Sequence, residues 1–495
     1  MKQAIHIFKK DARHLWPAIL AVLALAALYA YAGALSFPAV TQLSSALDRS
    51  NSLIQLAMPL GWWYLIAATI HEEALPGFQQ FWLTRPYSWK SLLLAKALFI
   101  IAFVNLPKLL ADCVILQVHG FHASSYWPNL IGSQILFTAV WVLPFAALAA
   151  VTRDLRQFSL AVIIGIISIA LAPLILSSSG LSPFLSGYWV GFTWIQDFIL
   201  IGIVLMASLL ILFWQYSHRR TAVTRMIGIG AVVLVIGSSQ LLPMRALMAM
   251  QVRWSDSRLD ASQIQISLDP NRKQPTNVTT GEHVGAIQIN IPILVTSLEQ
   301  DRELFCDDLA VEIEGLDGKV SRVPGRIVQD DDGFWQRIFV EPPIFQKLKA
   351  EPVTLRSSAY FTLLGDKSTM RIEPQERATE VPGLGMCQLS RRAESFAMAC
   401  YSPFRMPYRF AKVFLHYPGN AIDQYIEPGS YLPYPAQAGI SPLVVSVRSS
   451  GSFGSNSSAN AMGATIITEA PLAHCRRDFE LRGLRLIDYS SSDEH

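Results

Sequence analysis

The stretch LLLAKALFIIAFVNLPKLLADCVILQV, from Leu92 to Val118, decides the fold that the sequence predicts. A helix of about 20 apolar residues is long enough to cross the hydrocarbon core of a bilayer. Six further runs of similar length flank it, separated by short polar segments. Buried helices of a soluble protein seldom follow one another in this way, so we expect a membrane α-helical bundle with seven spans: Leu15–Leu35, Leu53–Ile70, Leu92–Val118, Leu130–Val151, Phe158–Leu176, Phe192–Trp214 and Met226–Leu242.

The chain of 495 residues divides near residue 247 into halves of different composition. Residues 1–247 hold 15 Lys and Arg against 7 Asp and Glu, whereas residues 248–495 hold 25 against 30. The first half is therefore poor in charge and net positive, and the second is charge-rich and net negative. This contrast predicts a transmembrane domain over 15–247 and a soluble-type domain over 248–495. Neither half carries a nucleic-acid signature.

Lys and Arg are distributed unevenly among the segments that join the seven runs. In short loops these residues are retained on the cytoplasmic side of a membrane. With the N-terminus inside, the opposite loops contain only Arg49, and we expect a multi-pass protein of the cytoplasmic (inner) membrane with residues 248–495 outside the cytoplasm. The basic residues assigned to the cytoplasmic side are Lys2, Lys9, Lys10, Arg13, Arg85, Lys90, Lys96, Arg153, Arg156, Arg219, Arg220 and Arg225.

Residues 1–16 have helical amphipathic spacing. Their apolar residues recur opposite Lys2, Lys9 and Lys10, which is typical of a short helix lying on the inner membrane interface. The apolar residues are Ala4, Ile5, Phe8, Ala12 and Leu15. Two alternatives remain open: an unstructured basic tail, or a secretory signal that ends near Ala32-Gly33-Ala34.

The loop after the second run, HEEALPGFQQFWLTRPYSWK, spans residues 71–90. Pro76-Gly77 predicts a tight turn, Pro86 breaks a helix, and the aromatic residues suit the headgroup zone. We therefore expect a short, rigid, charged element at the cytoplasmic face, with an anchoring loop for the third span as the alternative. A zinc-peptidase motif is excluded, because Leu75 stands where H-E-x-x-H needs its second histidine.

The run LPGFQQFWLTRPYSWKSLLLAK, preceded by paired acids, resembles the membrane subunits of ATP-binding-cassette exporters of the type-2 permease class. The resemblance covers about the first half of the chain. It implies a dimer of permeases, homomeric or heteromeric, and a coupling loop that docks on a separate ATPase subunit. Carried over by position, the residues at or beside that contact are Glu72, Glu73, Pro76, Gly77, Phe81, Trp82, Arg85 and Pro86. The seventh span and the large outer domain depart from the simple members of the family.

The chain has no nucleotide-binding motif of its own, since G-x-x-x-x-G-K-[ST] does not occur. We therefore expect no cofactor in this chain, and ATP and Mg on the partner ATPase. The chain itself is expected to be a transport subunit and not an enzyme.

The third run contains the polar residues Asn105, Lys108 and Asp112. Such groups are costly inside a bilayer unless they are paired or hydrated. Lys108 and Asp112 are four residues apart and share a helical face. Either they form a neutralising structural pair, or they line a polar path through the membrane.

The second half alternates apolar and polar residues in short segments, and Asp317-Gly318 marks a hairpin turn. This pattern predicts an all-β, sandwich-like domain over residues 255–475, with a brief helix near Ile344–Ala350. The alternating segments are Gln263–Leu268, Ala286–Ile291, Val311–Glu314 and Val444–Val447.

Four of the five cysteines lie in this second half, where an extracytoplasmic environment would allow disulfides. Cys387 and Cys400 are spaced as on adjacent strands joined by a turn, so we favour that bridge, with Cys306 to Cys475 as the other. Four unrelated thiols are the alternative. The sequence predicts no metal site, because C-x-x-C is absent and the histidines are scattered.

Together these features predict the permease subunit of an ATP-driven exporter. The alternative is a membrane-anchored envelope or sensory protein whose outer β-domain binds a ligand or protein without transport.

Overall fold

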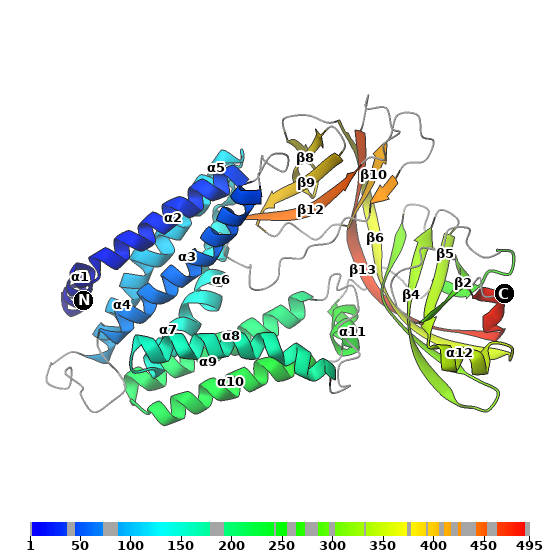
Figure 1. The fold of residues 1–495 in the computed structure, drawn as a ribbon, viewed down its shortest axis with the longest axis horizontal. Helices are drawn as coiled ribbons and strands as arrows, with labels where there is room; N and C mark the ends of the chain where they lie inside the picture. The colour runs from blue at the N-terminus through cyan, green and yellow to red at the C-terminus, as the bar shows by residue number, and fades with distance from the viewer. Residues whose placement is uncertain are drawn as a thin grey trace.

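The computed structural model contains a helical part and a β-rich part that lie side by side (Figure 1). The N-terminus lies at the far end of the helical part and the C-terminus at the far end of the β-rich part. The structure describes residues 2–36, 45–72, 88–178, 193–241, 244–254, 264–272, 286–296, 302–330, 333–373, 378–392, 395–404, 410–416, 424–426, 442–452 and 463–490.

Helices follow the predicted apolar runs. Five helical segments in the described residues are long and apolar enough to cross a membrane: Trp16–Ala34, Trp89–Val118, Ala123–Val151, Phe198–Ser217 and Thr221–Ser238. The other two predicted runs lie in α3 and α8, and the described part of each does not reach that standard of length and apolarity, so the count of seven spans stays a prediction. The elements are α1 (Lys2–His14), α2 (Trp16–Ser36), α3 (Ser45–His71), α4 (Trp89–Ile100), η2 (Ile101–Asn105), α5 (Leu106–Val118), η3 (Ala123–Tyr126), α6 (Trp127–Phe137), η4 (Thr138–Val142), α7 (Leu143–Val151), α8 (Leu155–Ser178), α9 (Thr193–Ser217), α10 (Thr221–Leu241) and α11 (Met244–Trp254).

Two of the long helical segments contain a π-helical turn. In η2 the N–H of Leu106 donates to the carbonyl of Ile101, and in η4 the N–H of Leu143 donates to that of Thr138, five residues back in each case. A proline follows directly at position 107 and at position 144. Proline cannot donate the usual helical hydrogen bond, and a π turn is one way a helix accommodates such a disruption. Isolated π turns are also frequent at functional sites.

The predicted N-terminal helix forms as α1, and four residues of its predicted apolar face, Ala4, Phe8, Ala12 and Leu15, pack against the helical part. Ile5 is instead 44% exposed, and Ile7 and Asp11 are buried on the same helix. The predicted boundary at residues 247/248 falls inside α11.

The β-rich part contains a nine-stranded antiparallel sheet in the order β1-β2-β5-β4-β3-β6-β13-β10-β11. Its apolar face, together with α12 (Pro342–Leu348), forms one hydrophobic core. The strands are β1 (Gln265–Leu268), β2 (Ile287–Thr296), β3 (Glu303–Glu314), β4 (Val320–Asp330), β5 (Gly333–Val340), β6 (Val353–Ile372), β10 (Phe410–His416), β11 (Gln424–Ile426) and β13 (Gly463–Leu484). All four alternating segments singled out in the sequence contribute to strands, and Gly318 takes the positive φ of 71° at the β3–β4 turn.

A second, four-stranded sheet has the order β12-β9-β8-β7, formed by Leu443–Ser452, Ser395–Pro403, Gly385–Arg392 and Thr379–Val381. One hydrophobic cluster joins it to the end of the large sheet: Met398 and Leu389 pack with Ile466 and Val413. The two sheets are therefore in contact there. Most of the β-rich part is nevertheless the single large sheet, and the predicted sandwich over residues 255–475 is not confirmed.

The structure confirms one predicted disulfide and contradicts the other. Cys387 and Cys400 face each other on β8 and β9 and form a disulfide, with Cα atoms 4.0 Å apart. Cys306 and Cys475 are free thiols. Both are paired with Phe361, from opposite sides of β6. Their Cα atoms are therefore two strand spacings apart, each of about 4.8 Å. This separation exceeds about 7 Å, the largest distance between Cα atoms that a disulfide can bridge.

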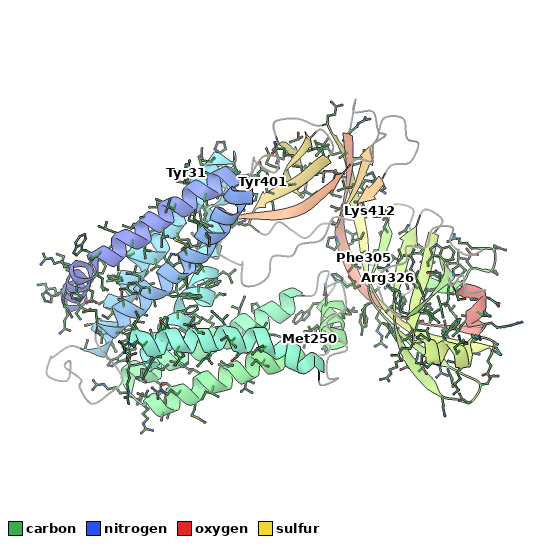
Figure 2. The ribbon with its side chains drawn as sticks, in the orientation of Figure 1. Tyr31, Met250, Phe305, Arg326, Tyr401 and Lys412 are labelled. Carbon is green, nitrogen blue, oxygen red and sulfur yellow. A yellow bond between two sulfur atoms is a disulfide. The ribbon has the colours of Figure 1, made fainter. Side chains whose placement is uncertain are left out.

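The helical and β-rich parts meet at two places. In the first, β9 contacts the connection between α5 and α6: the ring of Tyr401 lies 5.7 Å from His119 and 6.2 Å from Phe121, centroid to centroid. Figure 2 shows Tyr401 at this junction. In the second, α11 lies against β13, and Met248 packs with Tyr360.

Candidate functional site

The predicted coupling loop begins at the end of α3 and ends before α4. Of its candidate residues, Glu72 is described, and it lies next to the last residue of α3. The others, Glu73, Pro76, Gly77, Phe81, Trp82, Arg85 and Pro86, lie outside the described residues. The described part of the candidate site therefore consists of the two flanks of segment 73–87.

Helix α1 contacts both flanks of this segment. On one flank, His14 Nε2 lies 3.1 Å from Glu72 Oε1. On the other, Lys96 Nζ in α4 lies 2.8 Å from Asp11 Oδ2. Phe8 adds ring contacts to Phe99 and Phe103, at 6.3 and 5.9 Å between centroids. We call Asp11, His14, Glu72 and Lys96 the loop-base cluster.

The Asp11–Lys96 pair is buried, with side chains 0% and 3% exposed. Lys96 was assigned to a cytoplasmic loop in the charge count, but it lies within α4. Asp11 was not singled out at all. Its signal in the sequence is an acid placed at helical spacing with Ala4 and Ile7, since an acid on a buried face needs a basic partner.

A histidine next to Glu72 fixes the end of α3. His71 Nε2 lies 3.0 Å from the carbonyl oxygen of Ala149 and 3.1 Å from Thr152 Oγ1, both at the end of α7. The flank of segment 73–87 is therefore tied to α7 as well as to α1. In the described part of the chain, no group of three His, Cys, Asp or Glu side chains is placed to hold a metal ion.

A second polar group lies in the middle of the helical part, between η2–α5 and α6–η4. Lys108 and Asp112 form the ion pair that their spacing predicts, with Nζ and Oδ2 2.5 Å apart and both side chains fully buried. The Lys108 ammonium also lies 5.5 Å from the centre of the Phe137 ring. Asn105 donates to Thr138 Oγ1 at 2.7 Å and approaches Gln134 Oε1 at 3.4 Å.

This mid-helix polar cluster comprises Asn105, Lys108, Asp112, Gln134 and Thr138. Sequence reasoning missed Gln134 and Thr138, although their spacing of four in an apolar run is a recognisable signal. Three buried atoms of the cluster have no partner in the structure: Asp112 Oδ1, Asn105 Oδ1 and Gln134 Nε2. The geometry therefore supports a self-neutralised pair that also retains hydrogen-bonding capacity.

Strands β3, β6, β10 and β13 of the large sheet carry a cluster of two carboxyl groups and two lysines. Glu303 pairs with Lys412 and, at 3.1 Å, with Lys367. Glu469 lies beside them with its side chain 3% exposed. Burial, with help from the negative charge of Glu303, raises the pKa of Glu469 from 4.5 to about 7. Burial alone would raise the pKa of Glu303 too, but the bond to Lys412 holds it below its ordinary value.

The shifted pKa of Glu469 predicts a pH-dependent stability of the β-rich part. Between pH 4.5 and about 7 the folded chain holds a proton that the unfolded chain has lost. Stability therefore falls as pH rises through this window, by on the order of 3 kcal/mol. We expect Glu469→Gln to abolish this fall in stability with pH. The measurement is the urea concentration at the midpoint of unfolding, followed by hydrogen exchange in β3 and β13. The exposed Glu351→Gln should keep the wild-type profile, and a Glu469→Gln profile equal to wild type would refute the assignment.

Comparison with protein-family models, with curated proteins and with solved structures found no match.

Proposed function

We propose that the chain is the permease subunit of an ATP-driven exporter and works with a separate ATPase subunit. In this proposal the apolar helices cross the cytoplasmic membrane with the N-terminus inside, and the β-rich part lies outside. Segment 73–87 is the coupling loop on which the ATPase docks. Two permease subunits, identical or different, form the transport unit.

The observation that carries the proposal is the way α1 holds the base of this segment. The sequence between Glu72 and Ser88 resembles a coupling loop, and one amphipathic helix contacts both of its flanks, through His14 to Glu72 and through the buried Asp11–Lys96 ion pair. His71 fixes the same flank to α7. A load applied to the segment would therefore act on α1, α3, α4 and α7 together. This arrangement suits alternating access, in which closure of the ATPases displaces the loop and the helices respond.

The proposal predicts that reversing the loop charges releases the ATPase. The double variant Glu72→Lys/Arg85→Glu should reduce the amount of ATPase that co-purifies with the chain by about tenfold or more, because like charges then face each other across the interface. The partner is recognised by a P-loop and an LSGGQ sequence in the co-purified protein. Co-purification and the ATPase rate of the purified complex are the measurements.

A matched control exchanges the exposed pair Glu312 and Arg322 on the large sheet, whose Arg322 Nε and Glu312 Oε1 atoms are 2.9 Å apart. Glu312→Lys/Arg322→Glu makes the same change in charge far from the loop and should retain the ATPase. ATPase binding that survives the loop variant unchanged contradicts the coupling-loop assignment. A wild-type chain that captures no ATPase supports the alternative, a membrane-anchored binding or sensory protein.

A further inference from the structure

Helix α11 joins the last apolar helix to the β-rich part and lies on the large sheet. Its residues Leu247, Met248 and Gln251 are 2%, 1% and 6% exposed. Met248 packs against Tyr360 of β6, and Gln251 reaches His474 of β13. Figure 1 shows α11 between the helices and the sheet, and Figure 2 places Met250 on α11, with Phe305 and Arg326 on the sheet across from it. The contact of α11 with the sheet is therefore one of the two places at which the helical and β-rich parts meet.

A continuous chain of polar side chains crosses this junction. Gln251 Nε2 lies 2.7 Å from His474 Nε2. His474 Nδ1 lies 2.9 Å from Thr362 Oγ1, and that hydroxyl lies 2.6 Å from Asp307 Oδ2. The chain thus runs from α11 through β13 and β6 to β3. It ends at a carboxyl group whose other oxygen, Oδ1, is buried without a partner.

The chain can be completed in two ways that differ by one proton. With Asp307 ionised, Gln251 donates to His474 Nε2, His474 Nδ1–H donates to Thr362, and the hydroxyl donates to Asp307. With Asp307 protonated, every bond reverses: Asp307 donates to Thr362, Thr362 donates to His474 Nδ1, and Nε2–H donates to Gln251. The amide of Gln251 then turns over and pairs its Oε1, which otherwise lies buried without a partner.

The first pattern converts into the second by the uptake of one proton and its relay along the hydrogen-bond chain. A hydronium ion of the solvent gives a proton to His474 Nε2 and becomes water, the Nδ1 proton passes to Thr362 Oγ1, and the hydroxyl proton passes to Asp307 Oδ2. Histidine is neutral before and after the transfer. No other acceptor, donor or co-reactant is needed.

The surroundings favour the protonated carboxyl. Burial raises the pKa of Asp307 well above its ordinary value, and the neighbouring charge of Asp308 raises it further, whereas the Thr362 hydrogen bond lowers it. Burial lowers the pKa of His474, which keeps the ring neutral.

Other titratable and charged groups lie nearby on β3, β13, β4 and α11. On β3 these are Asp308 and Cys306, and burial raises the pKa of the Cys306 thiol. Those on β13 are Cys475, whose pKa burial also raises, with Arg477 beside it and Arg476 stacked over Tyr360 of β6. On β4, Arg326 lies on the side that faces α11, and on α11 itself Arg253 is exposed.

We propose that Asp307 is a proton-binding site, connected through Thr362 and His474 to Gln251, and that its protonation holds α11 on the sheet. Releasing α11 takes Gln251 away from His474 and opens this end of the hydrogen-bond chain to water, so the protonated pattern loses its last partner. Docking is therefore linked to proton uptake and weakens as pH rises. The consequence is a junction between the helical and β-rich parts that responds to the pH of the compartment around the sheet.

Hydrogen exchange of α11 in the full chain, reconstituted in lipid nanodiscs, tests this proposal. After correction for intrinsic exchange, the opening constant of α11 should rise with pH above the ordinary range of a carboxyl group, by up to about tenfold per pH unit. Asp307→Asn should abolish this rise and keep α11 protected throughout, because the amide donates to Thr362 as the protonated acid does. The exposed Asp478→Asn, on β13, should retain the wild-type profile.

A second variant and a second readout guard against a simple folding defect. Gln251→Leu keeps the volume but cuts the hydrogen-bond chain, so α11 should exchange at the lower end of the pH range as fast as the wild type does at its upper end. In wild-type protein at the lower pH, infrared spectroscopy should show a protonated-carboxyl band that Asp307→Asn lacks. An unchanged pH dependence in Asp307→Asn, or α11 exchange that is independent of pH in the wild type, would overturn the proposal.

Discussion

Lys108→Met should destabilise the helical part by about 3 to 5 kcal/mol, because it leaves the Asp112 carboxylate buried without its partner. Both side chains are fully buried, and Asp112 Oδ1 has no partner even in the wild type. Removal of Lys108 would therefore strand the whole carboxyl group. The double variant Lys108→Met/Asp112→Leu should recover most of the loss, since it removes both charges and fills the same space with apolar atoms.

The measurement is a double-mutant cycle on the thermal midpoint of the chain in detergent, in which the coupling between the two sites isolates the pair. Lys90→Met, an exposed change of the same kind on α4, should be close to neutral. If the double variant is stable but ATPase activity of the complex is lost, the pair belongs to the transport path. A single variant as stable as wild type would mean that the pair is not the buried, interacting unit that the geometry describes.

Local patterns in the sequence predicted those features whose partners are close along the chain. The apolar runs predicted helices, the spacing of Lys108 and Asp112 predicted their ion pair, and the hairpin-like spacing of Cys387 and Cys400 predicted their disulfide. In each case the partners are brought together by one helix or one turn. Secondary structure alone therefore determines the contact.

Features that depend on distant partners could not be predicted in this way. Alternation shows which face of a strand is buried, but it does not show which strand is the neighbour. Strand β6 separates β3 from β13 in the sheet, and for that reason the predicted Cys306–Cys475 bridge was wrong. The hydrogen-bond chain from Gln251 to Asp307 could not be predicted for the same reason, because it needs α11, β13, β6 and β3 in that order.

The residues of the candidate site also differ in whether a local sequence pattern could identify them. The loop residues were chosen for their sequence alone, and Glu72 is the one that the structure describes. The residues that hold the base of the loop, Asp11 and Lys96, are 85 positions apart and meet only because α1 folds back on α4. A single sequence shows that Asp11 interrupts an apolar face, but not which cation it meets.

Asp11→Ala should be the more damaging of the two single changes at the loop base, with a loss of about 3 to 5 kcal/mol. It leaves the Lys96 ammonium, 3% exposed, without this carboxylate. Lys96→Met should cost less, because Lys10 Nζ lies 3.8 Å from the other oxygen of Asp11 and is itself 39% exposed. A charged group that keeps a solvated partner is less destabilising than one left in a dry contact.

Exchanging the charges of Asp11 and Lys96 distinguishes the contribution of their ion pair from that of the surrounding apolar packing. Asp11→Lys/Lys96→Asp restores one cation and one anion at the contact between α1 and α4, and it should recover part of the stability lost in Asp11→Ala. The readout is tryptic cleavage at Lys9 and Arg13, which becomes faster when α1 leaves α4, measured beside the thermal midpoint. His14→Gln changes the exposed member of the loop-base cluster and should leave both values near wild type, since an exposed polar contact contributes little. If cleavage is equally slow in the wild type and in Asp11→Ala, the aromatic contacts of Phe8 with Phe99 and Phe103 hold α1, and the buried pair does not.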